Sequence, residues 1–195
     1  AAVTTHPVVV QEIARIVKET GGEVTIADSP GGPFSRRILK RFYNAAGLTD
    51  VANEVGVELN FDTTSSEVNY KEGRVSKSFE LANFITDTDV IINLPKLKTH
   101  RLTMYTGAVK NLYGAIPGLI KGEYHLKMQQ VDIFSELLID LALLIKPSIN
   151  IMDAIVGMEG EKGPSAGEPR QFNYLLGAES PLALDIASIK LMGIE

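Results

Sequence analysis

"DVIINLPKLKTHRLTMYTGAVKNLYG", residues 89–114, carries the pattern that decides the fold class. Its opening, 89–94, is a short apolar run with polar ends, which is typical of a buried strand in a parallel sheet. Two lysines and a histidine follow this run directly, and 103–114 reads as a helix with Lys110 on a stripe of small residues. The stretch therefore predicts a strand that ends in a basic segment, and a helix that returns one more cation toward it.

The rest of the chain alternates between helix-like and strand-like segments. Apolar residues at helical spacing, bounded by capping residues, proline and glycine, predict helices, whereas short apolar runs predict strands. A Glu-Gly turn inside 68–82 predicts a β-hairpin. We expect helices over 4–22, 34–48, 103–114, 129–145 and 180–193, strands over 23–27, 57–61, 89–94, 148–156 and 172–180, and a loop over 157–171. This order indicates an α/β fold with a mostly parallel sheet, helices on both faces and a small β-hairpin insertion.

Composition narrows the classes of protein that this chain can be. A length of 195 residues suits one domain, and a net charge of −5 argues against nucleic acid and anionic membrane as partners. The absence of Cys excludes a disulfide, a thiolate metal site and a Cys-ligated iron–sulfur cluster within the chain, and fits the cytoplasm. The longest apolar stretch, 137–145, is too short to span a bilayer. The start at Ala1 and the open end at "LMGIE" indicate a fragment of a longer protein, truncated at the N-terminus.

Three unusual segments follow predicted strands. They are the turn that begins at Asp28, the basic segment 95–100 and the Gly-rich loop that follows Asp153. Ligands of open parallel sheets bind beyond the carboxyl ends of the strands, so we expect the three segments to meet at one edge of the sheet. Cations gathered there would hold an anion such as a phosphate or a carboxylate.

Candidate roles follow from the residue types. Clustered lysines lower one another's pKa and a histidine titrates near neutrality, which suits proton transfer. The candidate catalytic residues are therefore Lys98, His100 and Lys110. Lys96 would help to bind the anion, and the carboxylates would orient the cations or neutralise them. The candidate ligand-binding residues chosen on this basis are Asp28, Ser29, Lys96, Asp153 and Glu159.

Plainer interpretations stand beside these. The lysines can pair internally with carboxylates, His100 can cap a helix or lie on the surface, and the loop 157–171 can be a lid or an ordinary surface loop. A divalent metal held by histidines and aspartates is a weak hypothesis, because the spacing of His6, His100 and His125 fits no short metal motif.

The paired blocks "INLPKLKTH" and "TGAVKNLYG" resemble the domain-of-unknown-function family 362, as do "TTHPVVVQEI", "ADSPGG" and "DAIVGMEGEKGPSAGEP". The resemblance covers nearly the whole chain and adds Asn93, Asn111 and His125 to the candidate ligand-binding residues. Members of that family are often linked to iron–sulfur modules with Cys-rich, ferredoxin-like segments, an attribute that no residue of this Cys-free chain can carry. The family also has an N-terminal strand with a Lys-Pro-Asn signature, which is missing here.

Two functions remain open at this point. One is a domain or enzyme that binds a small anionic compound through the Lys/His cluster, with acid–base catalysis. The other is a non-catalytic module that docks a ferredoxin-like iron–sulfur partner through its lysines. A concave site with half-buried lysines would favour the first, and a flat exposed basic patch would favour the second.

Overall fold

The computed structural model describes residues 2–128 and 130–194, without the side chains of His125 and Lys127. The helices in chain order are α1 (Pro7–Glu19), α2 (Arg36–Ala45), α3 (Leu48–Val55), α4 (Asn83–Thr86), α5 (Ala108–Asn111), the 3₁₀ turn η1 (Leu112–Ala115), α6 (Gly118–Lys127), α7 (Val131–Ile145) and α8 (Pro181–Met192). The strands are β1 (Thr25–Ile26), β2 (Glu58–Leu59), β3 (Ser65–Asn69), β4 (Ser78–Ala82), β5 (Ile92–Asn93), β6 (Lys96–His100), β7 (Met104–Thr106), β8 (Ile149–Glu159) and β9 (Glu168–Ala178).

The main sheet of the described residues is mixed and is centred on β8. Strands β5 and β6 pair with β8 in parallel, whereas β9 pairs with β8 and β7 pairs with β6 in antiparallel fashion. The predicted α/β class and the hairpin, β3 with β4, are confirmed. The sheet is parallel at its centre and antiparallel toward β7 and β9, because short turns lead into these two strands and a parallel neighbour would need a long crossover.

Strands β5 and β6 form one extended path that is interrupted at Pro95. Ile92, Asn93 and Lys96 face Ile149, Asn150 and Asp153 in one constant register. Proline has no N–H to give to a ladder, but its carbonyl still accepts from the N–H of Asp153 at 2.9 Å. The register then shifts before Lys98, which lies opposite Met158. This irregularity turns the second half of the basic strand relative to β8.

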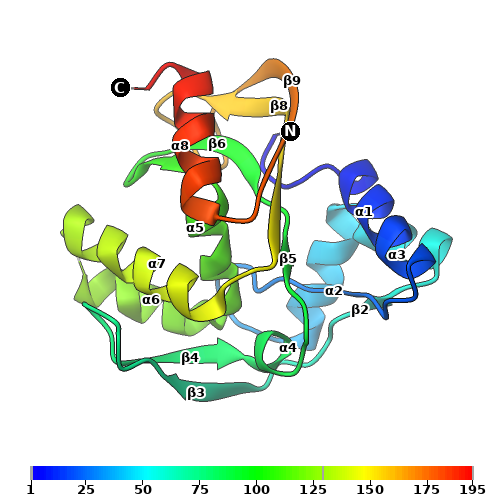
Figure 1. Cartoon of the computed structure of the whole chain (residues 1–195), viewed down its shortest axis with the longest axis horizontal. Coiled ribbons are helices and arrows are strands. Elements are labelled where there is room, and N and C mark those ends of the chain that lie inside the picture. The colour runs from blue at the N-terminus through cyan, green and yellow to red at the C-terminus, as the bar shows by residue number, and fades with distance from the viewer. Residues whose placement is uncertain (1, 129, 195) are drawn as a thin grey trace.

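The two faces of β8 are covered by different elements. Met152 and Ala154 are buried with Leu184 of α8 and Ala108 of α5 in one apolar cluster. Side chains alternate along a strand, so Asp153 between them points to the opposite face, toward the N-terminal segment. In Figure 1, α8 lies beside β8 and β9, and α1 lies toward the other side of these strands.

Helix α1 lies within the predicted range 4–22 and starts at Pro7. His6 is its N-cap residue, with a side-chain nitrogen that accepts from the N–H of Val8 at 3.3 Å, and Pro7 follows in the first turn. Val10 of α1 packs with Leu39 and Tyr43 of α2 and Leu48 of α3 in a second apolar cluster. Helices α1, α2 and α3 lie together on one side of the molecule in Figure 1.

A third apolar cluster joins α7, η1 and the hairpin of β3 and β4. Asp140 of α7 is buried and accepts from the backbone N–H groups of Arg74, Val75 and Ser76 at 2.7–3.2 Å. A buried carboxylate is stable when backbone donors surround it in this way, so Asp140 fastens the hairpin turn to the helix. Figure 1 shows α6 and α7 alongside this hairpin.

The helix predicted over 103–114 is wrong in its first half. Residues 104–106 form β7, which pairs with β6, and helical structure begins only at α5. Met104 has φ 59°, a left-handed value that no regular helix accommodates. Asp185 of α8 then accepts from the N–H groups of Ala108 and Val109 and starts α5. This cap comes from far along the chain, so no local pattern announces it.

The loop predicted over 157–171 is wrong at both ends. β8 continues to Glu159 and β9 begins at Glu168, which leaves only a turn between two long antiparallel strands. Glycine and proline are poor strand formers, but the backbone pairing of the two strands stabilises the extended conformation here. Helices α3 and α6 were not predicted. The predicted helix 34–48 ends early because Gly47 takes φ 72°, after which α3 begins.

Candidate functional site

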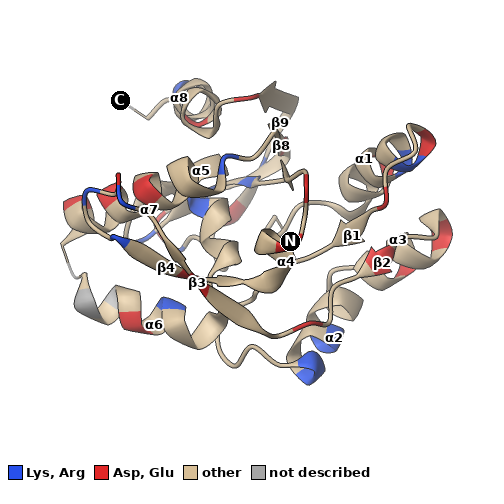
Figure 2. Cartoon of the chain, turned by 60° about the horizontal axis from the view of Figure 1, so that its bottom comes forward, with Lys and Arg blue, Asp and Glu red and all other residues tan. Residues whose placement is uncertain are grey.

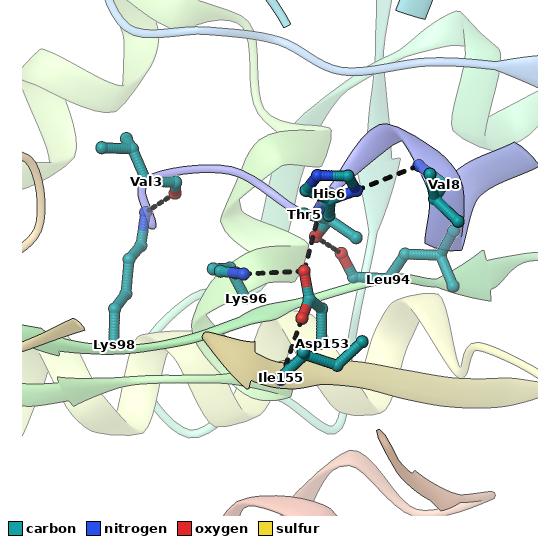
Figure 3. A network of polar contacts seen from close by, with 9 residues as sticks. All are labelled: Val3, Thr5, His6, Val8, Leu94, Lys96, Lys98, Asp153 and Ile155. Atoms are coloured by element: carbon teal, nitrogen blue, oxygen red, sulfur yellow. Dashed lines mark hydrogen bonds and ion pairs between the residues drawn. The ribbon is translucent and has the colours of Figure 1, made fainter. Parts of the chain in front are cut away.

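The first lysine of the basic strand is paired inside the protein. Lys96 Nζ lies 2.7 Å from Asp153 Oδ2, and both side chains are buried. The same carboxylate accepts from the N–H of His6 at 2.9 Å and from the N–H of Ile155 at 3.1 Å (Figure 3). Asp153 therefore holds a cation and the start of α1 at once. For Lys96, this is the internal pairing that the sequence left open.

The second lysine of the strand lies in a different environment. Lys98 is half-buried, and its Nζ donates to the carbonyl of Val3 at 2.7 Å, as Figure 3 shows. Burial lowers the pKa of Lys98, the charge of Asp28 opposes this effect, and the charge of Lys96 adds to it. A neutral carbonyl thus satisfies one hydrogen of this ammonium without cancelling its charge.

Two further lysines act on the same region. Lys110 comes from α5 and Lys121 from α6, and both are half-buried. Burial, together with the charges of Lys98 and Lys121, lowers the pKa of Lys110 to about 8. Burial likewise lowers the pKa of Lys121 to about 8, against the opposing attraction of Asp28. Nζ of Lys121 donates to the carbonyl of Ser29.

Lys110 differs from its neighbours in its contacts. Its ammonium makes no hydrogen bond and no ion pair with any residue that the structure describes, and lies 5.9 Å from the ring centroid of Tyr113. A cation over an aromatic face gains about 0.5–1 kcal/mol at exposed sites, which is less than a carboxylate partner would supply.

Asp28 is the carboxylate that faces these cations. Burial raises its pKa, and Lys121, the N–H of Ser29 and Lys98 act in the opposite direction. Its Oδ1 would lie 3.2 Å from a Cβ built on Gly114, so a glycine there permits the close approach of η1. Next to it, the buried Oγ of Ser29 has no hydrogen-bond partner among the described residues. We call Lys98, Lys110 and Lys121, with Asp28, the basic cluster.

A buried amide network sets the position of Lys110. Asn93 donates to the carbonyl of Ala108 at 2.9 Å and to the side chain of Asn150 at 2.8 Å, and it accepts from Asn111 at 2.8 Å. Asn93 belongs to β5 and Asn150 to β8, so the network ties α5 to the centre of the sheet. Asn93 and Asn111 therefore lie behind the basic cluster and orient the helix that carries Lys110.

The profile of the family described as Domain of unknown function (DUF362) matches residues 1–190. The chain belongs to the DUF362 family. Among curated proteins, the thylakoid-associated protein sll1697 of Synechocystis sp. is 31% identical over 198 residues, which cover 98% of this chain and 58% of that protein. The DUF362 chain thus spans about three fifths of the length of this relative. Within the described residues, no helix has the length and apolar character needed to cross a membrane.

Two sequence candidates of the DUF362 domain are engaged elsewhere. The ring nitrogen Nδ1 of His100 accepts from the N–H groups of Leu102 and Thr103 at 3.1 and 3.3 Å, which closes the turn between β6 and β7. Glu159 pairs with Arg170 at 2.8 Å across β8 and β9, and both side chains are exposed. His125 lies in α6, but its side chain falls outside the described part of the structure.

The structure adds Lys121, which was not among the candidates. The polar block 121–125 lies between two apolar segments of the DUF362 chain, and that interruption was the available signal. A local pattern could not show that α6 turns Lys121 toward Ser29 and Asp28. By contrast, Arg36, Arg37, Lys40 and Arg41 form an exposed basic face on α2, visible in Figure 2, as expected of a solvated helix.

Other possible sites of the DUF362 domain are less developed. Two hollows of the described surface lie away from the basic cluster, one beside Leu81 and Leu144 and one between Arg15 and Val55. Among the described residues, no group of three or more His, Asp or Glu side chains is arranged to hold a metal ion. The basic cluster is therefore the candidate functional site.

Proposed function

We propose that this domain binds a small anionic compound, a phosphate or a carboxylate, at the basic cluster and moves a proton there through a lysine. One observation carries the proposal. Two half-buried lysines, Lys98 and Lys121, both lower the pKa of a third, Lys110, while Asp28 is the carboxylate that acts on the first two. Like charges at close range raise the electrostatic energy of a protein, and an anion that joins them lowers it.

The size of this effect is sufficient for useful binding. Two unit charges 4 Å apart attract by about 4 kcal/mol at the effective dielectric constant of a protein surface. Lys98 and Lys121 already have their ammonium groups held by backbone carbonyls, which limits the conformational freedom that binding would cost. An anion between these two ammoniums and Lys110 would gain from three cations at once.

The partial burial of the lysines favours a small ligand over a protein partner. A docking surface for an iron–sulfur carrier would place its lysines on an exposed rim, whereas Lys98, Lys110 and Lys121 are each half-buried. Docking remains the second hypothesis and is an outcome of the experiment below.

Thermal unfolding in the presence of inorganic phosphate, lactate or succinate tests the proposal. A ligand at a hundred times its Kd adds about 2.7 kcal/mol of stability, so a clear rise in Tm is expected. Lys110→Gln and Lys121→Gln should reduce the rise. Lys40→Gln, an exposed lysine of α2, is the matched control and should keep it.

The docking hypothesis predicts a different pattern. The anions would leave Tm unchanged, while an acidic ferredoxin would bind in a salt-dependent manner and lose affinity in the same two variants. That combination would overturn small-anion binding.

We also propose that the domain works in the cytoplasm. The name of its Synechocystis relative suggests the alternative of association with a membrane surface. Fractionation of cells decides between them. A cytoplasmic domain stays in the supernatant, whereas a peripheral one sediments with membranes and is released by salt.

A further inference from the structure

Lys110 is the lysine of this region whose contacts suit a neutral amine. Lys96 is bonded to a carboxylate, and Lys98 and Lys121 are bonded to carbonyl oxygens. Each of these acceptors favours the protonated, charged form of its lysine. Lys110 is half-buried without a hydrogen bond or ion pair to the described residues, and its ammonium lies 5.9 Å from the ring centroid of Tyr113.

The neighbours of Lys110 act in the same direction as its burial. Lys98 and Lys121 bring positive charge toward it, and Asp28 acts on those two lysines. A desolvated amine beside other cations loses its proton more readily than a lysine in water. Its pKa of about 8 places a useful fraction of the neutral form near physiological pH. A neutral amine has a lone pair, and lysines in such surroundings attack carbonyl carbons.

We propose that Lys110 forms a Schiff base with a small oxo acid, a compound that carries both a carbonyl group and a carboxylate. Lys98 and Lys121 hold the carboxylate, and Nζ of Lys110 meets the carbonyl carbon. This inference rests on the proposed function, because the carboxylate is the anion of that site. It goes further by naming the substrate class and the nucleophile.

The step balances without an oxidant or reductant. The lone pair of Nζ attacks the carbonyl carbon, a C–N bond forms, and the carbonyl oxygen becomes a hydroxyl group with a proton from the nitrogen. A second proton, supplied by the ammonium of Lys98 or Lys121, lets that oxygen leave as water. A protonated C=N bond remains. The lysine that gave the proton regains one from solvent.

Asn93 and Asn111 give the nucleophile a defined position. Their amides link the sheet to α5, so the backbone of Lys110 is held by β5 and not by an independent loop. A nucleophile fixed to a rigid element keeps its reacting atom near the geometry of attack, which raises the rate of an intramolecular step.

Reductive trapping tests the inference on the intact chain. The protein is mixed with pyruvate and sodium cyanoborohydride near neutral pH, digested, and mapped by mass spectrometry. We expect the reduced adduct on Lys110 at a level at least roughly tenfold above that on exposed lysines, whose amines titrate near 10.4 in water. Lactate has the same carboxylate without a ketone, so it should suppress the adduct.

Two variants complete the test. Lys110→Arg keeps a positive charge but removes the amine, so the specific adduct should vanish while Tm confirms that the variant folds. Lys40→Arg on α2 is the matched control, and its trapping at Lys110 should equal that of the wild type. Equal labelling of many lysines, or an undiminished total adduct in Lys110→Arg, would overturn the inference.

The outcome separates this inference from the proposal on which it rests. If lactate and phosphate raise Tm in the wild-type protein and no Lys110 adduct forms, the anion site stands and the Schiff base is wrong. If neither anion raises Tm and no adduct forms, both are wrong.

Discussion

Lys96 and Lys98 are two residues apart on β6, yet they have different partners. Lys96 is buried against Asp153, which also holds the N–H of His6. Lys98 is half-buried and donates a hydrogen bond to a carbonyl. The charge of Asp28 raises its pKa, whereas burial and the charge of Lys96 lower it. A lysine that has a carboxylate of its own stabilises the fold. Lysines that share one carboxylate keep an excess of positive charge, which a ligand can neutralise. The register shift between the two residues separates these environments.

The largest effect is expected at the paired lysine. Asp153→Asn removes the charge that balances Lys96 and weakens the acceptor for His6. Breaking a buried ion pair by removing one partner costs about 3–5 kcal/mol, and urea unfolding would measure it. A loss below about 1 kcal/mol, which is the range of an exposed ion pair, would contradict the structural role given to the pair of Lys96 and Asp153.

The amide network should give the next largest effect. Asn93→Ala leaves the carbonyl of Ala108 and the side chains of Asn111 and Asn150 without their donor or acceptor. One buried polar group left unsatisfied costs about 1–3 kcal/mol, and we expect a loss near that size because Asn150 keeps its bonds to the carbonyls of Ala178 and Glu179. Urea unfolding measures the loss of stability. Asn173→Ala on β9 is not a suitable control, because Asn173 has a left-handed φ of 62°. Asn44→Ala, at an exposed position of α2, serves instead.

A smaller effect is expected at Lys98. Lys98→Gln removes one hydrogen bond to Val3, worth about 0.5–1.5 kcal/mol, and it also removes a charge that acts on Lys110. The pKa of Lys110 should therefore rise. NMR titration of the lysine side chains, labelled with ¹⁵N, would detect the rise, and an unchanged or lower pKa would show that the two lysines do not interact.

The smallest loss of stability is expected at Lys110. Near neutral pH, Lys110→Gln should cause no loss of stability, because no hydrogen bond or ion pair to the described residues is lost and a half-buried charge beside other cations is removed. The folded-state pKa of about 8 lies below the value of about 10.4 for an unfolded lysine. Between these values the unfolded chain binds more protons than the folded one, so this group adds stability as the pH rises.

Wild type should accordingly gain stability relative to Lys110→Gln as the pH rises from 8 toward 10, by denaturant unfolding at each pH. A difference that stays flat across this window would mean that Lys110 titrates like a lysine in water.

Much of the fold and part of the site followed from local patterns. The helix within 4–22, the hairpin and the strand that leads into the lysines were predicted because their signals are local. The rule about strand ends predicted that Asp28 would meet the lysines at one edge of one sheet, but β1, the strand before Asp28, pairs with β2 in a separate two-stranded sheet, and Lys98 lies inside β6. The sequence did not predict that Lys96 is the lysine paired with a carboxylate of its own, because that partner lies 57 residues away in the sequence.

The failures share a physical cause. β7 replaces a helix turn because Met104 adopts a left-handed conformation and Asp185 supplies a cap from α8. β8 and β9 extend into Gly-rich sequence because each gives the other its backbone partners. In both cases, distant contacts outweigh the local propensity on which sequence patterns depend.

The bond between His6 and Asp153 has a consequence for how the chain is made. The two residues are 147 positions apart, so during synthesis α1 leaves the ribosome long before its anchor exists. A contact of this span forms only after both of its segments have been synthesised, and closing so long a loop is slow. Helix α1 is thus fixed to β8 late, and until then Asp153 and Lys96 have no covering segment.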